Sequence, residues 1–151
     1  MKRKPERLGE ILIARGLIIP QQLETALEEQ KKTDALLGEI LVKRKMITEK
    51  DLLEALSDQF NIPYITIKYN YIDWDFVKEF SPSLILDYNS FPMEKDDWSV
   101  TIAITNPLDA KVLAKAEQET KGLRLKLVLV SGSDMTEVKS RYREHIKGKY
   151  F

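Results

Sequence analysis

The sequence predicts an α+β protein with a helical N-terminal part and a C-terminal part that mixes helices with a small sheet. Residues 7–30 read RLGEILIARGLIIPQQLETALEEQ, and 29 places later residues 36–59 read LLGEILVKRKMITEKDLLEALSDQ, with 11 of the 24 positions identical. Apolar residues recur at helical spacing in both copies. After residue 61 the pattern changes to short alternating segments such as YITI, which are typical of strands. We therefore expect a helical subdomain over residues 1–61 and an α+β subdomain over residues 62–151.

Each copy predicts two helices joined by a turn. In the first copy a helix begins near Pro5 and ends at Gly16, because glycine readily takes the left-handed conformation that ends helices. A second helix begins near Pro20. In the second copy Thr48 is a natural N-cap, and Asp51 follows at the position of a capping box. The helical subdomain should thus contain two tandem helix-turn-helix units.

The second half predicts a small α/β sandwich-like subdomain with a mostly antiparallel sheet. The expected strands are YITI, SFPM, WSVTIAIT and LRLKLVLV, and the expected helices are DWDFVKEF, PSLILDY, a segment running to about Lys121, and SDMTEVKSRYREHI. Asn106 and Pro107 resemble the cap and first turn of the third helix, and Gly122 resembles its end.

The charge balance argues against a nucleic-acid partner. Lys plus Arg and Asp plus Glu both number 24, whereas a nucleic-acid-binding chain concentrates basic residues on one face or tail. No apolar run approaches the roughly 20 residues of a membrane helix, and there is no signal-peptide core. We therefore expect a cytoplasmic protein without direct membrane insertion, peripheral to the inner membrane only through a partner.

The residues needed for catalysis or metal binding are missing from the pattern. There is no cysteine, which excludes disulfides and thiolate sites, and no glycine opens a phosphate-binding loop of the GxxxxGK[ST] or GxGxxG type. The single histidine, His145, lies in a charged helix and is expected at the surface. The aspartates Asp87, Asp96, Asp97 and Asp109 are expected in turns or caps. The sequence predicts neither an enzyme nor a metal site, and it predicts no cofactor.

Some of the repeated residues need more than an amphipathic helix to explain them. Gly9 and Gly38 interrupt helical patterns at a cost of about 1 kcal/mol relative to alanine, which indicates close approach by another chain segment or by a ligand. Gln30 and Gln59 place amides on apolar faces, where they need a partner inside the protein or on a ligand. Arginine, glycine, leucine and glutamine together suit a nucleotide, and two units offer two half-sites.

The first copy resembles a known motif. Arg7-Leu8-Gly9 and the later positions Leu12, Gly16, Leu23, Leu27 and Gln30 match the 24-residue motif of the MshEN domain. That domain is the N-terminal domain of type II secretion and type IV pilus assembly ATPases of the GspE, MshE and PilB kind. The family carries two motifs separated by five residues, as residues 31–35 separate them here. The resemblance continues through NIPYITI, VTIAITNPLDAKVLAKAEQETKG and SRYREHI.

The resemblance implies a non-catalytic regulatory and docking domain. In this family the paired motifs can bind cyclic di-GMP, and the domain links the ATPase core, in cis or in trans, to the cytoplasmic domain of an inner-membrane platform protein. Carried over, the ligand set is Arg7, Leu8, Gly9, Leu12, Gly16, Leu23, Leu27, Gln30, Leu37, Gly38, Leu41, Leu52, Leu56 and Gln59. The alternative is a pure protein-protein interaction module that docks the ATPase to the platform protein without nucleotide binding.

The second copy departs from the motif at two positions. Leu36 replaces the arginine, and the loss of a charge-assisted hydrogen bond is worth roughly 1.5–3 kcal/mol, or about ten- to a hundredfold in affinity. Lys45 replaces the second glycine. If that turn still needs a positive φ, the lysine backbone is strained by about 1 kcal/mol, while its ammonium is available to a phosphate.

Overall fold

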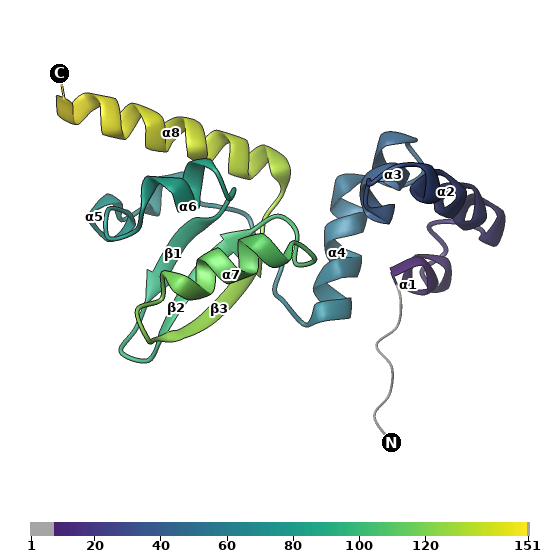
Figure 1. Cartoon of the computed structure of the whole chain (residues 1–151), viewed down its shortest axis with the longest axis horizontal. Coiled ribbons are helices and arrows are strands. Elements are labelled where there is room, and N and C mark those ends of the chain that lie inside the picture. Colours follow the sequence, from purple (N-terminus) through teal and green to yellow (C-terminus); the bar gives the residue numbers. More distant parts are fainter. Residues whose placement is uncertain (1–7, 151) are drawn as a thin grey trace. The chain divides into compact units, whose positions relative to one another are not determined.

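The computed structural model describes residues 8–150, with all their side chains except those of residues 70 and 148–150. Along the chain the elements are α1 (Leu8–Ala14), α2 (Pro20–Lys32), α3 (Leu37–Lys43), α4 (Glu49–Phe60), a 3-10 turn (Tyr69–Tyr71), α5 (Trp74–Val77), α6 (Pro82–Leu86), β1 (Phe91–Lys95), β2 (Ser99–Ile104), α7 (Ala110–Gln118), β3 (Arg124–Leu129) and α8 (Gly132–Tyr150). The chain divides into two compact units after Asn61, a helical unit with α1–α4 and an α+β unit with the remaining elements (Figure 1).

In the helical unit the two copies interlock. Helix α1 packs against α4, and α2 packs against α3, so the first helix of each copy lies on the second helix of the other. The core follows the repeat, because Leu12 and its equivalent Leu41 are fully buried, as are Ala26 and its equivalent Ala55. The two tandem helix-turn-helix units predicted from the repeat are confirmed, and neither copy buries its apolar face alone.

The α+β unit is built on a three-stranded sheet in the order β1-β2-β3. Strands β1 and β2 form an antiparallel pair, in which Phe91 lies opposite Ala103, with a bulge between Pro92 and Glu94. Strands β2 and β3 pair in parallel, because α7 carries the chain back across the sheet between them. The α+β class is confirmed, and the sheet divides evenly between antiparallel and parallel pairs, where the sequence indicated a mostly antiparallel one.

Helices cover both faces of the sheet (Figure 1). Met135, Val138 and Tyr142 recur on one side of α8 and share a core with Phe91 and Ala103. Successive strand residues point to opposite faces, so the fully buried Ile102 and Ile104 face the other way, which is the side of the crossover helix α7. The unit is therefore a three-layer arrangement with α8 and α7 on opposite sides.

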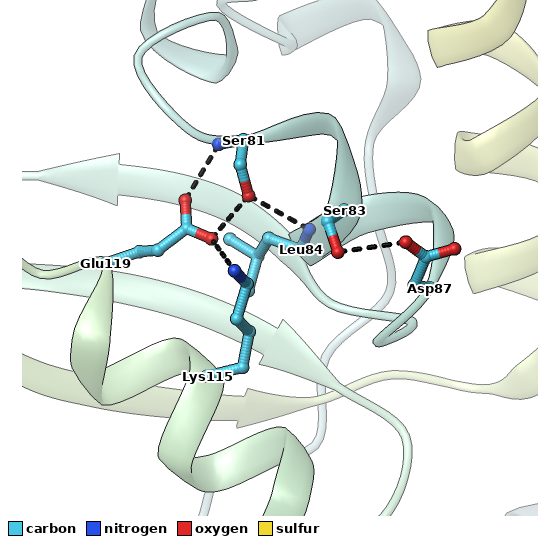
Figure 2. Close-up of polar contacts among 6 residues, drawn as sticks. All are labelled: Ser81, Ser83, Leu84, Asp87, Lys115 and Glu119. Atoms are coloured by element: carbon cyan, nitrogen blue, oxygen red, sulfur yellow. Dashed lines mark hydrogen bonds and ion pairs between the residues drawn. The ribbon is translucent and has the colours of Figure 1, made fainter.

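A polar contact joins the start of α6 to the end of α7 (Figure 2). Glu119 accepts hydrogen bonds from the backbone nitrogen of Ser81 at 2.7 Å and from its hydroxyl at 2.5 Å, and Lys115 Nζ lies 3.3 Å from the same carboxylate. Burial by itself would raise the pKa of Glu119, but the bonds from Ser81 and Lys115 outweigh it and lower that pKa. Ser81 also caps α6, since its hydroxyl accepts from Leu84 N.

Two local predictions are wrong. The YITI segment forms only a single bridge, in which Tyr64 pairs with Leu129. The ladder goes no further because β3 ends at Leu129 and the chain enters α8 at Gly132, and the backbone N–H of Ile67 donates to Asp134 Oδ2 of α8 at 3.0 Å. Asn106 does not cap α7. Its side chain accepts from Leu108 N in a turn, and Asp109 is the N-cap, because its Oδ1 accepts from the backbone N–H groups of Lys111 and Val112.

Candidate functional site

The repeated glycines make room for a leucine of the same copy. A Cβ atom added to Gly9 would lie 2.7 Å from Leu23 Cδ1, and one added to Gly38 would lie 2.6 Å from Leu52 Cδ1. A Cβ atom almost never lies within 3 Å of another side chain's carbon, so only glycine admits these leucines without a shift. Both pairs belong to the predicted ligand set. The structure thus supplies one reason for the repeated Gly and Leu, which is close packing of the two helices within each copy.

The turn after the first helix is the same in both copies. Leu17 N donates to Leu12 O and Gly16 N to Ile13 O, and the second copy repeats these bonds as Met46 N to Leu41 O and Lys45 N to Val42 O. This is the Schellman arrangement, which needs a left-handed residue. Gly16 has φ +73° and Lys45 has φ 60°. The second copy therefore keeps the turn with a lysine in a backbone conformation that favours glycine.

The predicted ligand residues differ in how far they reach the surface. Buried members are Leu8, Gly9, Leu12, Gly38, Leu41 and Leu56; half-buried members are Leu23, Gln30, Leu37, Leu52 and Gln59; exposed members are Gly16 and Leu27. Arg7 lies outside the described residues. The side chains that reach the surface are thus Leu23, Leu27, Leu37, Leu52 and the two glutamines, while Leu12, Leu41 and Leu56 lie in the core.

A hollow of about 410 Å³ lies between the first and last helices of the helical unit. It is lined by Ile11 and Ala14 of α1, by Arg15 directly after that helix, and by Asp58 and Gln59 of α4. Arg15 and Asp58 form an ion pair across it. Of these five residues only Gln59 belongs to the predicted ligand set. Arg15 is not among the predicted ligand residues, although the repeat carries the same residue, Arg44, at the equivalent position.

The second copy repeats this ion pair with the roles of the copies exchanged. Arg44 Nε and Nη2 lie 3.0 and 2.5 Å from Glu29 Oε1. Arg44 is 29 residues after Arg15, and Asp58 is 29 residues after Glu29. The hydrogen bond from Arg44 lowers the pKa of the Glu29 carboxyl and raises that of the guanidinium. Each ion pair therefore joins the first helix of one copy to the second helix of the other.

The α+β unit contains a separate aromatic pocket of about 310 Å³. His145 and Trp74 stack in its wall with ring centroids 4.7 Å apart and 12° between the planes, and Tyr142 stacks on the same tryptophan. The expectation that His145 lies at the surface is wrong, because the Trp74 ring covers one of its faces and leaves it half-buried. Within the described residues, no group of three or more His, Cys, Asp or Glu side chains is placed to hold a metal ion.

Comparisons with known proteins identify the family. Residues 60–148, which run from the end of α4 into α8, match the family described as MshEN domain. The chain belongs to the MshEN domain family. Among solved structures, MshE with cdg shares the fold at a TM-score of 0.80 and 24% identity, covering 91% of this chain and 99% of that chain. The N-terminal domain of XpsE shares it at a TM-score of 0.69 and 18% identity, covering 93% of this chain and 97% of that chain.

The family match and the tandem motifs occupy different parts of this MshEN domain. The matched residues begin at the last residue of α4, so the match rests on the α+β unit. The structural similarity, in contrast, covers nine-tenths of the chain and so includes both units. No curated protein sequence matches the chain. Among the described residues, no helix is long and apolar enough to cross a membrane.

Proposed function

We propose that this MshEN domain is a non-catalytic regulatory and docking domain of a type II secretion or type IV pilus assembly ATPase, and that its tandem motifs bind cyclic di-GMP. The observation that carries the proposal is the reciprocal packing of the two copies, which pairs α1 with α4 and α2 with α3. Two equivalent half-sites related in this way suit a ligand with two equivalent halves. The similarity in fold to MshE with cdg, read as cyclic di-GMP, adds support.

The first copy is the better preserved half of this proposed site. It keeps Gly16 in the turn at φ +73° and presents Leu27 to solvent with 39% of its side chain exposed. Its motif begins with Arg7, where the second copy has Leu36. We expect the first copy to contribute most of the binding free energy, with leucine and arginine side chains covering the guanine bases.

Isothermal titration of the purified chain with cyclic di-GMP tests the proposal. Binding should be detected at ligand concentrations on the order of tens of micromolar, and Arg7→Ala should lower the affinity about ten- to a hundredfold. Arg3→Ala is the matched control, since it removes an arginine from the same terminal segment without touching the motif. GMP should give no comparable heat. Absence of heat with cyclic di-GMP, or identical affinities for Arg7→Ala and the parent chain, would contradict nucleotide binding.

The second candidate is a protein-protein interaction module that docks the ATPase without nucleotide binding. One observation favours it: the family match lies in residues 60–148, outside both motifs. Capture of the ATPase core and of the cytoplasmic domain of the platform protein should be measured with and without cyclic di-GMP. Capture that does not change with nucleotide favours this candidate, and capture that responds to nucleotide favours regulation. Failure to capture either protein would exclude docking.

A further inference from the structure

We propose that Arg15 is a phosphate contact of the ligand site and that Asp58 occupies its guanidinium until an anionic ligand replaces it. The proposal deepens the proposed function and rests on it, because the anion in question is the phosphodiester of cyclic di-GMP. Neither residue belongs to the ligand set implied by the motif. The inference comes from the position of the ion pair in the hollow and from its repetition in the second copy.

The location of Arg15 places a cation beside a residue of the ligand set. Its side chain and that of Gln59 line the same hollow, and the remaining lining residues are Ile11, Ala14 and Asp58. The hollow thus contains one cationic group, one carboxylate and one amide against an apolar wall. At about 410 Å³, it is within the usual size range of small-molecule sites.

The ion pair is of a kind that a ligand can replace. The Asp58 side chain is 65% exposed and that of Arg15 is 32% exposed, and ion pairs at this level of exposure contribute little to stability. The two non-bridging oxygens of a phosphodiester can accept a pair of hydrogen bonds from the guanidinium, as the two oxygens of a carboxylate do. Exchange of one acceptor for the other therefore leaves the arginine satisfied and releases Asp58 to solvent.

The repeat shows the same arrangement with the copies exchanged. Glu29 and Asp58 immediately precede Gln30 and Gln59, and each carboxylate binds the arginine of the other copy. In each copy the glutamine thus directly follows a carboxylate that binds the arginine of the other copy. In the second half-site this puts a guanidinium next to Gln59, in the copy whose own motif begins with Leu36 instead of arginine.

Titration of four chains with cyclic di-GMP tests the inference: the parent, Arg15→Gln, Asp58→Asn, and Glu79→Gln as a control. Arg15→Gln should lower the affinity about ten- to a hundredfold, because a charge-assisted hydrogen bond is lost. Asp58→Asn should raise it, because the competing carboxylate is gone. Glu79→Gln removes a carboxylate from an exposed ion pair with Lys95 in the other unit and should leave the affinity unchanged. Thermal unfolding of each chain checks that all four are folded.

The opposite changes in affinity expected for Arg15→Gln and Asp58→Asn distinguish a ligand contact from an ion pair that only stabilises the helix packing. If the ion pair only holds α1 on α4, both variants loosen the same contact, so their affinities fall together or do not change. Either result with a parent chain that binds would overturn the inference and leave the proposed function standing. If the parent chain gives no heat with cyclic di-GMP but Asp58→Asn binds it, the result would support the inference and contradict nucleotide binding by the parent. If neither the parent nor Asp58→Asn binds cyclic di-GMP, both proposals would be overturned.

Discussion

The two copies of the motif build the same helix pair although 13 of their 24 positions differ, and three of these differences concern the turn, the cap and the motif arginine. Gly16 corresponds to Lys45 in the turn, Ile19 to Thr48 at the start of the second helix, and the arginine that opens the first motif to Leu36. Two contacts are common to both copies: glycine packs against leucine within each copy, and an arginine pairs with a carboxylate between the copies. The close packing of glycine on leucine is therefore common to both copies, while three of the changed residues lie in the turn, at the cap and at the motif arginine.

The starts of the second helices show how different residues reach the same result. Thr48 Oγ1 accepts from Asp51 N at 3.0 Å, and Asp51 Oδ2 accepts from Thr48 N at 3.2 Å, so the predicted capping box is confirmed. Ile19 has no side-chain acceptor, and only the reverse bond remains, from Ile19 N to Gln22 Oε1 at 2.9 Å. Pro20 at the first helical position offsets part of this loss, because its fixed φ already suits the helix.

The largest expected effect concerns the lost motif arginine. Leu36→Arg should raise the affinity for cyclic di-GMP about ten- to a hundredfold, because it restores a charge-assisted hydrogen bond worth roughly 1.5–3 kcal/mol. Titration calorimetry measures it, with Leu36→Gln as a polar control that carries no charge. Equal affinities of the arginine and glutamine variants would show that the second copy does not use this position for the ligand.

The next effect tests the contact that the two copies share. Gly9→Ala and Gly38→Ala should each lower the free energy of unfolding by about 1–2 kcal/mol, since overpacking costs about 1–3 kcal/mol and alanine regains up to about 1 kcal/mol of helix propensity. Urea unfolding measures both. Adding Leu23→Ala or Leu52→Ala should cost less in these variants than in the parent chain, because the clash is relieved. If only one of the two glycine variants is destabilised, the Gly9–Leu23 and Gly38–Leu52 contacts are not equivalent, although their distances are.

A smaller effect is expected at the caps. Thr48→Ala should lower the free energy of unfolding by about 1 kcal/mol, and Ile19→Thr should raise it by about 0.5–1 kcal/mol by supplying the missing acceptor. Ile19 is 57% exposed, so little apolar burial is lost in the exchange. Denaturant midpoints of the two variants give the test. A destabilised Ile19→Thr would mean that this isoleucine has a packing role in the first copy.

The smallest effect is expected in the turn. Lys45→Gly should stabilise the chain by about 0.5 kcal/mol and Gly16→Lys should destabilise it by a similar amount. A positive φ costs a non-glycine residue about 1–2 kcal/mol, and the greater freedom of glycine in the unfolded chain offsets about 0.4–1 kcal/mol of that. A Cβ at Gly16 meets nothing within 4 Å, so conformation alone should set the difference. Thermal unfolding can show whether Lys45→Gly raises the melting temperature and Gly16→Lys lowers it.

Much of the fold was predictable because local signals and tertiary structure agree. Periodicity placed the four N-terminal helices, Thr48 and Asp51 marked a cap that the structure contains, and the change of pattern near residue 61 coincides with the division between units. The YITI strand was wrong because the partner of Ile67 N is Asp134, 67 residues further along the chain. Asn106 was wrong because Asn and Asp serve equally well in turns and caps, and Asp109 competes from three residues away.

For the candidate site, the repeated residues and the positions at which the second copy departs from the first can be read from the sequence. The tertiary structure decided what the repeated residues do. Periodicity cannot reveal that Leu23 fills the space above Gly9, or that Arg15 meets a carboxylate 43 residues later while Arg44 meets one 15 residues earlier. The physical reason is that a repeat records equivalent positions within each copy. The contacts between copies depend on how the two amphipathic helix pairs bury their apolar faces against each other.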